Sequence, residues 1–342
     1  MSVRFTLLVW FLAGTVLLAM SSCGPVPRGP NQEHLYAARS KVEVRSELAP
    51  DAPVTAVLAL HDRVRVLRRR RSLAFVQVEG GAEGWAREQE LISDEEWRHS
   101  RELARFTEIF PAQGVRRAFD TLNVHTTPSR QAPTIYQLAA EEPVDLIRSR
   151  VVEPPADSAA GRRGRSEAWF LVRAHAGPVG WALASRLYAD IPIDVAQYAE
   201  GRRIVAFFAL DDAPHPTWLW TQSSRGTFDF SSYRVFRWNT QRSSYQTIGL
   251  AKDLKGRLPV EVHEWVESER GSGPGFSLNL EREDGESVVR TYLLSGERVH
   301  RVSEKPTPPL IEVPDSFAVQ GESRDERNSW FEHWREKVET LL

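Results

Sequence analysis

The sequence predicts a mainly β protein, in which two copies of a small β-domain are joined by a helix and followed by an antiparallel β-domain and a C-terminal amphipathic helix. Residues 44–67 recur without a gap at 124–147, so that Ala52-Pro53 matches Ala132-Pro133. A Gly-Trp-Ala sequence follows each copy. Internal repeats of this kind indicate repeated structural units, so the duplication determines the architecture that we expect.

Length and charge exclude one class of partner. The chain has 342 residues, enough for two or three domains, and a net charge of −2. Sequence-independent binding of nucleic acid needs a concentrated basic face on the protein. The strongest basic run, four arginines at 68–71, lies between two strand-like segments and is interpreted as an exposed turn. We therefore expect no nucleic-acid partner.

The N-terminal 22 residues have the composition of a secretory signal, with a positive charge, an apolar run that ends at Met20, and two serines. The run is short for a membrane span, which needs about 20 apolar residues. A small residue directly before the single cysteine, Cys23, resembles the bacterial lipoprotein signal, although Met20 departs from the usual leucine. The resemblance implies an acylated Cys23 that anchors an exported body to an envelope membrane. This would be the periplasmic side of the outer membrane in a Gram-negative host. The alternatives are an ordinary signal peptide and an uncleaved anchor.

Changes in composition divide the rest of the chain. Val151 to Ser166 is rich in Pro, Ala, Gly and charge, which is typical of a disordered insertion. In chain order we predict a signal peptide (1–22), a Pro-rich tether (23–33), a first β-domain (34–93), a helical connector (94–115), a second β-domain (116–190) with the insertion at 151–166, an antiparallel β-domain (195–305), a Pro-rich linker (306–322) and a C-terminal helix (323–342).

The two repeats share an ordered set of motifs: an Asn-Val-Arg-like strand, a Pro-containing loop, a hairpin, an aromatic residue three positions before a valine, and Gly-Trp. These are Leu122 to His125, Leu138 to Leu146, Trp169 to Val172 and Gly180-Trp181 in the second copy, and Val42 to Arg45, Leu58 to Val66, Phe75 to Val78 and Gly84-Trp85 in the first. The set resembles the bacterial SH3 (SH3b) family. The first copy departs from it at Glu43, at Phe75 and at the arginine run. The resemblance implies two SH3-like small β-barrels.

The connector between the copies is predicted to be a helix. Ser93 is a plausible N-cap with Glu96 three residues on, which is a capping-box arrangement. Trp97, Leu103, Phe106 and Phe110 then fall near one helical face. We interpret this helix as a packed connector.

The last third of the chain has a different pattern. Seven strand-like segments lie between Arg203 and Leu294, and Asp284-Gly285 is a strong hairpin signal. Tyr233 to Trp238 carries large apolar groups on both alternations, so it should be a central strand. The final segment places Trp330, Trp334, Val338 and Leu341 on one helical face. We expect this helix to dock back on the protein, with membrane-surface binding as the alternative.

No catalytic or metal-binding constellation is recognisable. Bacterial SH3 domains often accompany cell-wall peptidases with a cysteine nucleophile, but Cys23 lies at the lipidation position. The nine histidines are scattered, and no pair has the spacing that zinc sites use. His263-Glu264 places a carboxylate beside a histidine, but neighbours on a strand face opposite sides. We predict no enzyme activity, no cofactor and no metal. An enzyme in residues 195–305 with unfamiliar residues is the least favoured alternative.

Binding is the favoured class of function, because small barrels bind peptides along grooves lined by aromatic and loop residues. The resemblance implies peptidoglycan, or wall-associated peptides or proteins, as ligands. The candidate ligand-binding residues are Tyr36, Arg45 and Trp85 in the first copy and His125, Trp169 and Trp181 in the second. For the Gly-Trp tryptophans, a place in the core is an open alternative. The alternative function is an assembly or scaffold lipoprotein that contacts only other envelope proteins.

Overall fold

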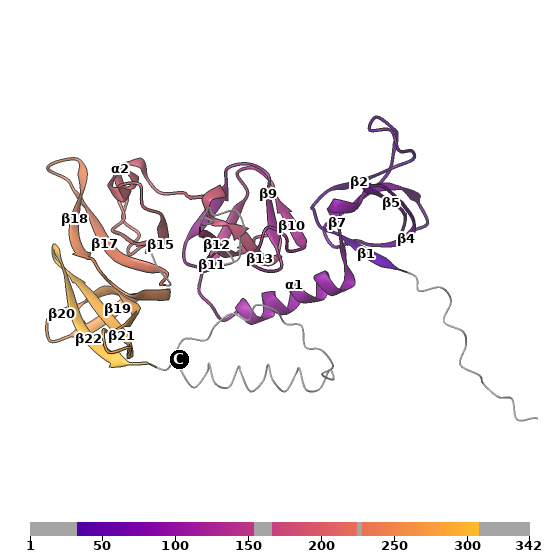
Figure 1. Ribbon diagram of the computed structural model, residues 1–342. Coiled ribbons are helices and arrows are strands. Elements are labelled where there is room, and N and C mark those ends of the chain that lie inside the picture. The colour runs from indigo at the N-terminus through magenta and orange to yellow at the C-terminus, as the bar shows by residue number, and fades with distance from the viewer. Residues whose placement is uncertain (1–32, 154–165, 224–227, 308–342) are drawn as a thin grey trace, which may run out of the picture. The chain divides into compact units, whose positions relative to one another are not determined.

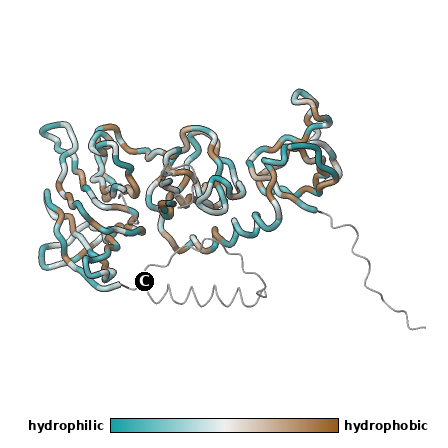
Figure 2. The backbone as a smooth tube through the Cα atoms, viewed as in Figure 1, coloured by the Kyte–Doolittle hydropathy of each residue, from teal (hydrophilic) through white to brown (hydrophobic). Residues whose placement is uncertain are grey.

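The computed structural model describes residues 33–153, 166–223 and 228–307. The proposed signal peptide, Cys23, most of the tether and insertion, and the helix predicted at 323–342 lie outside these ranges. Within them the protein is mainly β with antiparallel sheets, as predicted (Figure 1). No helix in the described ranges is long and apolar enough to cross a membrane. Apolar residues are distributed along the strands of each sheet (Figure 2).

The first repeat domain, residues 34–93, is one antiparallel sheet. Its strands are β1 (His34–Ala37), β2 (Val42–Arg45), β3 (Val54–Leu58), β4 (Arg63–Arg70), β5 (Leu73–Val78), β6 (Glu83–Arg87) and β7 (Leu91–Ser93), with the 3-10 turn η1 (Glu88–Glu90) before β7. The strand order is β3-β2-β6-β5-β4-β1-β7. Its core holds the alternate, inward residues of these strands, among them Val42, Val44 and Val64.

The second repeat domain, residues 116–190, repeats this arrangement strand for strand. It contains β8 (Val115–Ala118), β9 (Leu122–His125), β10 (Thr134–Leu138), β11 (Pro143–Val152), β12 (Glu167–Ala174), β13 (Val179–Leu183), η2 (Ala184–Arg186) and β14 (Leu187–Ala189). The order β10-β9-β13-β12-β11-β8-β14 matches the first sheet position by position. The duplication in sequence is thus a duplication in topology. The closure of each sheet into an SH3-like barrel goes beyond these pairings and stays a prediction.

The strand register corrects one match between the copies. Phe75 pairs with Trp85, whereas the residue paired with Trp181 is Leu171. Trp169 lies two residues earlier, opposite Leu183. The sequence match of Phe75 with Trp169 is therefore wrong by two residues, because Leu73 is the true counterpart of Trp169. Two residues are one strand period, so both side chains still point to the same face of the sheet.

Helix α1 (Asp94–Thr107) joins the two domains, and its predicted capping box is confirmed. The Ser93 hydroxyl accepts from the Glu96 amide at 3.2 Å, and the Glu96 carboxylate accepts from the Ser93 amide at 2.6 Å. Leu103 and Phe106 lie on the buried face of α1. With Phe110 they pack against β11, β12 and β13 of the second repeat domain. These contacts agree with the interpretation of the helix as a packed connector.

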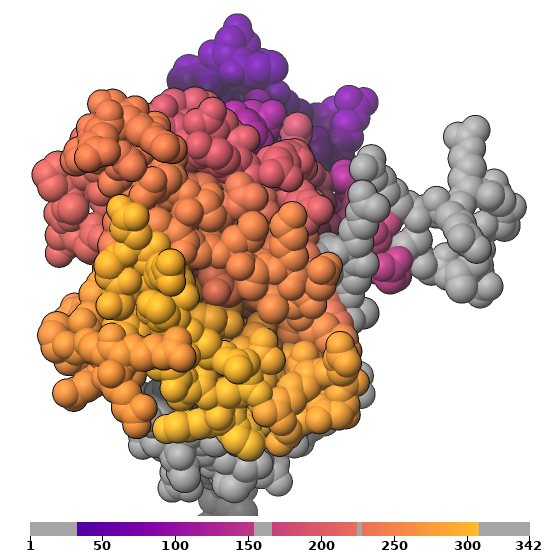
Figure 3. All heavy atoms as spheres, turned by 90° about the vertical axis from the view of Figure 1, so that its left-hand side faces the viewer, coloured from indigo at the N-terminus to yellow at the C-terminus, as the bar shows by residue number. Residues whose placement is uncertain are grey.

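The C-terminal β-domain, residues 195–305, is a third antiparallel sheet. After α2 (Ile193–Ala196) and η3 (Gln197–Ala199) come β15 (Ile204–Ala209), β16 (Trp218–Ser223), β17 (Phe230–Asn239), β18 (Ser244–Ala251), β19 (Gly256–Ser268), β20 (Gly271–Glu281), β21 (Ser287–Ser295) and β22 (Arg298–Pro306). The order is β15-β16-β17-β19-β20-β21-β22, and β18 pairs with β17. Figure 3 shows the atoms of this domain, orange to yellow, on the face turned toward the viewer.

Two sequence predictions for this domain are confirmed. Asp284-Gly285 lies in the turn between β20 and β21, where Gly285 has a φ of +86°. Strand β17 serves two cores, since Val235 belongs to one apolar cluster and Phe236 to another. Large apolar side chains are therefore needed on both faces of this strand, because each face packs into a different core.

Buried polar side chains connect the second repeat domain to the C-terminal β-domain. The Gln113 side-chain oxygen accepts a hydrogen bond from the Val260 backbone amide at 2.7 Å. The Gln113 side-chain nitrogen donates to the Val260 carbonyl at 3.3 Å. The Arg116 guanidinium donates to the carbonyls of Val205 at 2.8 Å and Ile204 at 3.3 Å. Buried polar groups without partners are costly, so these bonds make the contact specific.

Candidate functional site

The first repeat domain contains a cavity of about 470 Å³, a size typical of small-ligand sites. Two of the predicted ligand-binding residues, Arg45 and Trp85, are in its wall. Leu73 and the loop between β2 and β3 supply further apolar surface. The wall also holds seven charged side chains: Arg39, Lys41, Glu43, Arg45, Glu47, Arg87 and Glu90.

The local fold explains why Arg45 and Trp85 meet. Arg45 is the last residue of β2 and pairs directly with Trp85 on β6. A Cβ at Gly84 would lie 2.5 Å from the Arg45 carbonyl oxygen, so only glycine lets the two strands approach this closely. Gly180 makes the same close approach in the second repeat domain, with 2.7 Å to the His125 carbonyl oxygen. The glycine of each Gly-Trp motif is thus a packing requirement.

The charged groups of the cavity are arranged as neighbouring pairs. Arg39 bonds Glu90 at 2.9 Å, and Lys41 lies 3.3 Å from Glu43. Arg45 also bonds Glu43, and it donates to the Ala52 carbonyl at 2.7 Å. The hydrogen bond from Lys41 and the charge of Arg45 lower the pKa of Glu43. The cavity therefore presents fixed cations and anions side by side.

This arrangement suits a ligand that carries both signs of charge. Four of the seven charged side chains are cationic and three are carboxylates. Complementary placement of charges gives a binding site its specificity more than its affinity. Trp85, only 8% exposed, and Leu73 offer an apolar contact between the charged groups. A short peptide with free carboxylate and ammonium groups meets all of these requirements.

Trp85 of the cavity wall also belongs to an aromatic pair that an arginine covers. The rings of Phe75 and Trp85 lie 5.1 Å apart. The Arg68 guanidinium lies over both rings, at 4.5 Å from the first and 5.2 Å from the second, within the range of cation–π attraction. The prediction that residues 68–71 form a turn is mostly wrong. Strand β4 extends to Arg70, and only Arg71, with a φ of +55°, lies in the turn.

The second repeat domain does not present its tryptophans to solvent. Trp169 and Trp181 are 1% and 3% exposed, and Leu103, Phe106 and Phe110 cover them. Both tryptophans are in the core, which is the alternative that the sequence leaves open for a Gly-Trp tryptophan. A ligand cannot reach them while α1 is in place.

The two remaining candidate residues are also tied to protein partners. A ring nitrogen of His125 bonds the Ala132 carbonyl at 2.8 Å. Tyr36 is at the junction with α1, where its hydroxyl donates to Asp94 at 3.1 Å and its ring lies 5.8 Å from that of Trp97. The six predicted residues therefore do not form equivalent sites, and only Arg45 and Trp85 reach the cavity of the first repeat domain.

Sequence reasoning missed most of the charged wall. Lys41, Glu43 and Arg45 alternate with the buried Val42 and Val44, so their side chains share the outer face of one strand. That alternation is visible in the sequence and could have indicated a charged face. Arg39 and Glu90 come from distant segments, and only the fold shows that they contribute to the same wall.

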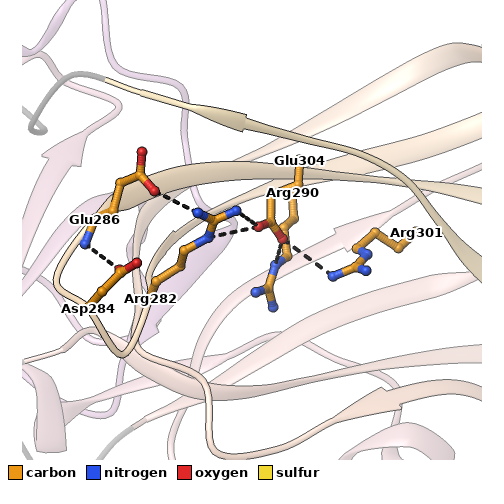
Figure 4. A network of polar contacts seen from close by, with 6 residues as sticks. All are labelled: Arg282, Asp284, Glu286, Arg290, Arg301 and Glu304. Carbon is orange, nitrogen blue, oxygen red and sulfur yellow. Dashed lines mark hydrogen bonds and ion pairs between the residues drawn. The ribbon is translucent and has the colours of Figure 1, made fainter.

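A second polar cluster joins β21, β22 and Arg282, which directly follows β20, and it acts as a structural brace. Figure 4 shows the Glu304 carboxylate facing Arg282, Arg290 and Arg301. Hydrogen bonds from Arg282 and Arg290 lower the pKa of Glu304 to about 2. Because Glu304 already occupies the centre of the three guanidinium groups, the cluster holds edge strand β22 and offers no vacant anion site.

The described residues show no constellation that favours catalysis. No group of three or more His, Cys, Asp or Glu side chains that could hold a metal ion occurs among them. His263 bonds the Ser277 hydroxyl at 2.7 Å, and Ser277 in turn lies 3.0 Å from the Thr291 hydroxyl. Ser277 is 4% exposed, so a substrate has no access to its oxygen.

Comparison with known proteins gives distant structural similarity alone. No protein-family model matches this chain, and no curated protein sequence matches it. NlpC1 from Trichomonas vaginalis is 10% identical over 67% of this chain and 93% of that chain, with a TM-score of 0.17. NlpC2 from the same organism is 11% identical over 81% and 98%, with a TM-score of 0.16. An NlpC/P60 family protein from Bacillus cereus is 11% identical over 80% and 94%, with a TM-score of 0.21. At these TM-scores the similarity carries no argument about activity.

Proposed function

We propose that this chain is a non-catalytic cell-envelope lipoprotein that binds peptidoglycan, or wall-associated peptides, through the cavity of the first repeat domain. The observation that carries the proposal is the position of Arg45 and Trp85 in one cavity with mixed charges. Both are also among the candidate ligand-binding residues that the resemblance to bacterial SH3 domains suggests. Within this proposal Cys23 carries the lipid anchor and residues 24–33 tether the body.

The chemistry of the wall supports a peptide ligand over a neutral glycan. Peptides of the cell wall carry carboxylate and ammonium groups, which complement the paired cations and carboxylates around Glu43 and Glu90. A neutral sugar carries no charge that could interact with these paired groups. Trp85 and Leu73 would contact the aliphatic part of the peptide.

The proposal differs from the sequence hypothesis in one respect. Tandem modules could gain avidity if both sites were engaged together. Here α1 covers the matching aromatic face of the second repeat domain. We therefore assign the binding to the first repeat domain alone, and we assign the second to holding α1 and the C-terminal β-domain.

A second candidate function is assembly or scaffolding with other envelope proteins. The observation that favours it is exposed apolar surface on edge strand β3, where Val54 is 43% and Val57 is 53% exposed. Exposed apolar patches on a folded domain often mark protein–protein contacts. In that case the chain would bind envelope proteins and would not bind the wall polymer.

The test is co-sedimentation of a soluble chain that starts at Gly24 with purified, protein-free sacculi. We expect saturable pelleting that Arg45→Ala weakens about tenfold or more, since a hydrogen bond to a charged group contributes about 1.5–3 kcal/mol. The matched control is Arg186→Ala, which removes an arginine paired with Asp120 on the second repeat domain. Unchanged pelleting of folded Arg45→Ala would reject this cavity as the site. A clean supernatant for the unmodified chain would favour the scaffold function.

A further inference from the structure

A cationic strand end of the first repeat domain lies outside the wall of the proposed ligand cavity. Strand β4 ends with Arg68, Arg69 and Arg70, and Arg71 follows in the turn to β5. All four side chains are exposed. We call residues 68–71 the arginine tip, and none of them lines the cavity.

Most of the charge of the arginine tip has no acidic partner. Arg69 bonds Glu88 at 2.6 Å. Arg68 lies over the Phe75 and Trp85 rings, a contact that does not neutralise its charge. For the three arginines other than Arg69, the described residues supply no carboxylate within ion-pair distance. The tip therefore presents a surplus of positive charge to the solvent.

The equivalent strand end of the second repeat domain is packed against other parts of the chain. By register, Arg148 and Ser149 are the counterparts of the first two arginines of the tip. Arg148 is 8% exposed, and its guanidinium lies 4.4 Å from the centre of the Phe110 ring. The Ser149 hydroxyl donates to Asp229 of the C-terminal β-domain at 2.6 Å. The strand end thus has a structural role in the second copy, whereas the tip of the first copy is exposed.

The tip borders the face of the first repeat domain that corresponds to the face under α1 in the second. Arg68 pairs with Phe75, and Arg70 pairs with Leu73. The positions that match Phe75 and Leu73 in the second copy lie under α1. In the first copy α1 contacts β1 and β7 instead, so this face stays open among the described residues. Leu67, directly before the tip, is 41% exposed on this open face. Helix α1 therefore leaves the tip accessible.

The tip lies at the end of the sheet at which the chain enters the first repeat domain. His34 at the start of β1 pairs with Arg65, and Tyr36 pairs with Arg63. Because the two strands are antiparallel, the start of β1 points along β4 toward the tip. Arg68 lies three residues beyond Arg65, which is about 10 Å along a strand. The start of β1 and the arginine tip are therefore neighbours.

This position keeps the tip close to a bilayer when Cys23 carries the lipid anchor. Cys23 lies eleven residues before His34 in the sequence. A fully extended chain spans at most about 3.6 Å per residue, so the start of β1 stays within about 40 Å of the anchored residue. The tip is at the tethered end of the domain, and it can therefore meet the bilayer surface without the domain turning over.

We propose that the arginine tip binds the phosphate groups of anionic phospholipids and orients the first repeat domain on the bilayer surface. The choice of a bilayer as the occupant rests on the lipid anchor of the proposed function, whereas the affinity for phosphate rests on the tip alone. Guanidinium groups suit phosphate because their planar forks donate paired hydrogen bonds to its oxygens. Clusters of basic residues next to a membrane anchor are attracted to anionic lipids in this way.

The experiment is vesicle flotation of the soluble chain from Gly24, which lacks the proposed anchor, at low ionic strength. The vesicles contain phosphatidylcholine with or without an equal amount of phosphatidylglycerol. We expect binding to the anionic vesicles alone, weakened by added salt because screening shortens the reach of the charges. Arg70→Gln combined with Arg71→Gln should weaken this binding about thirtyfold, since each arginine near an anionic surface contributes about fivefold.

The matched control removes the same charge elsewhere. Arg242→Gln combined with Arg298→Gln replaces two exposed arginines of the C-terminal β-domain and should leave vesicle binding nearly unchanged. An unchanged melting temperature shows that each variant is folded. Equal vesicle binding by the tip variant and the unmodified chain, or no binding at low ionic strength, would overturn the proposal. All these chains retain residues 323–342, so binding through that segment would appear as equal binding.

A reporter beside the tip locates the contact. The soluble chain has no cysteine of its own. Ser72→Cys, labelled with a polarity-sensitive fluorophore, should shift to the blue on anionic vesicles, and Ser185→Cys on the second repeat domain should not. A shift at Ser185→Cys with none at Ser72→Cys would overturn the tip as the contact. Binding of soluble polyphosphate without vesicle binding would overturn the bilayer as the occupant. Sacculus pelleting is measured separately, so failure of the ligand cavity leaves these results unaffected.

Discussion

The two repeat domains have the same strand order and differ in what lies on one face. In the second, Trp181 is 3% exposed because α1 covers it. In the first, Trp85 borders a charged cavity, and the Phe75 ring and the Arg68 guanidinium lie against it. The same Gly-Trp motif thus gives a core residue in one copy and a cavity wall in the other. The position of a single helix makes this difference.

The contrast indicates that the two copies of one domain can take different roles. The second repeat domain is packed on two sides, by α1 and by the C-terminal β-domain through Gln113 and Arg116. The first retains an exposed face and an open cavity. One copy therefore serves as a structural centre, and the other is available for binding.

The largest effect that we predict tests the covered face. Phe106→Ala should destabilise the folded chain by about 3–5 kcal/mol, because it empties a site that is 1% exposed. Phe75→Ala, on the open face of the first repeat domain, should cost about 1 kcal/mol, since its ring is only partly buried. Urea denaturation followed by tryptophan fluorescence measures both. Similar losses for the two variants would contradict the division into covered and open faces.

A smaller effect tests the contact with the C-terminal β-domain. Arg116 pairs with Val144, and in the first copy Leu35 pairs with the matching Val64. Arg116→Leu should therefore be tolerated by the core but should leave the carbonyls of Ile204 and Val205 unpaired, at a cost of about 1–3 kcal/mol.

Hydrogen exchange of β15 reports this loss most directly, because both carbonyls belong to that strand. We expect faster exchange there and unchanged exchange in β1 to β7. Arg117→Leu, which removes an exposed ion pair with Asp190, is the matched control. Unchanged protection of β15 in Arg116→Leu would show that the guanidinium does not hold the two domains together.

The smallest effect concerns pH at the junction of the first repeat domain with α1. The His61 ring lies against that of Trp97, with 3.8 Å between ring centres and a tilt of 39°. Burial and the charge of Arg101 lower the pKa of His61 to about 4 from 6.5. Because the unfolded chain binds the proton more readily, this stabilisation is complete above pH 6.5 and is lost as the pH falls toward 4. We expect a loss on the order of 1–2 kcal/mol across that window.

A matched substitution isolates the imidazole. His61 has a φ of +68°, and its counterpart Glu141 has a φ of +63°. Asparagine tolerates this left-handed conformation, so His61→Asn removes the titration without backbone strain. The difference in melting temperature between the unmodified chain and His61→Asn should change between pH 7 and pH 5. A constant difference would mean that His61 does not titrate in this range.

Features set by neighbouring residues were predictable from the sequence. The capping box of Ser93 and Glu96, the turn at Gly285 and the two-sided strand from Tyr233 to Trp238 each follow from a period or a turn requirement within a few positions. The duplication was visible for the same reason, since a repeated period of apolar residues produces a repeated strand order. Arg45 and Trp85 followed from motif positions.

Other features depended on distant contacts. The shift of two residues between Phe75 and Trp169 arises from strand register, which the alternating pattern alone does not determine, because a shift of one full period keeps every side chain on its face. The cavity brings Arg39 and Glu90 to the same wall from segments 51 residues apart. Their spacing in the sequence does not indicate that the two side chains meet in the fold.

The sequence by itself determined that two similar antiparallel sheets flank a capped helix, since periodicity and turn chemistry are properties of adjacent residues. The tertiary structure alone decided that α1 packs on Trp181 and leaves Trp85 at a cavity. Burial is a property of what lies above a side chain, and for these two tryptophans that neighbour comes from a different part of the chain.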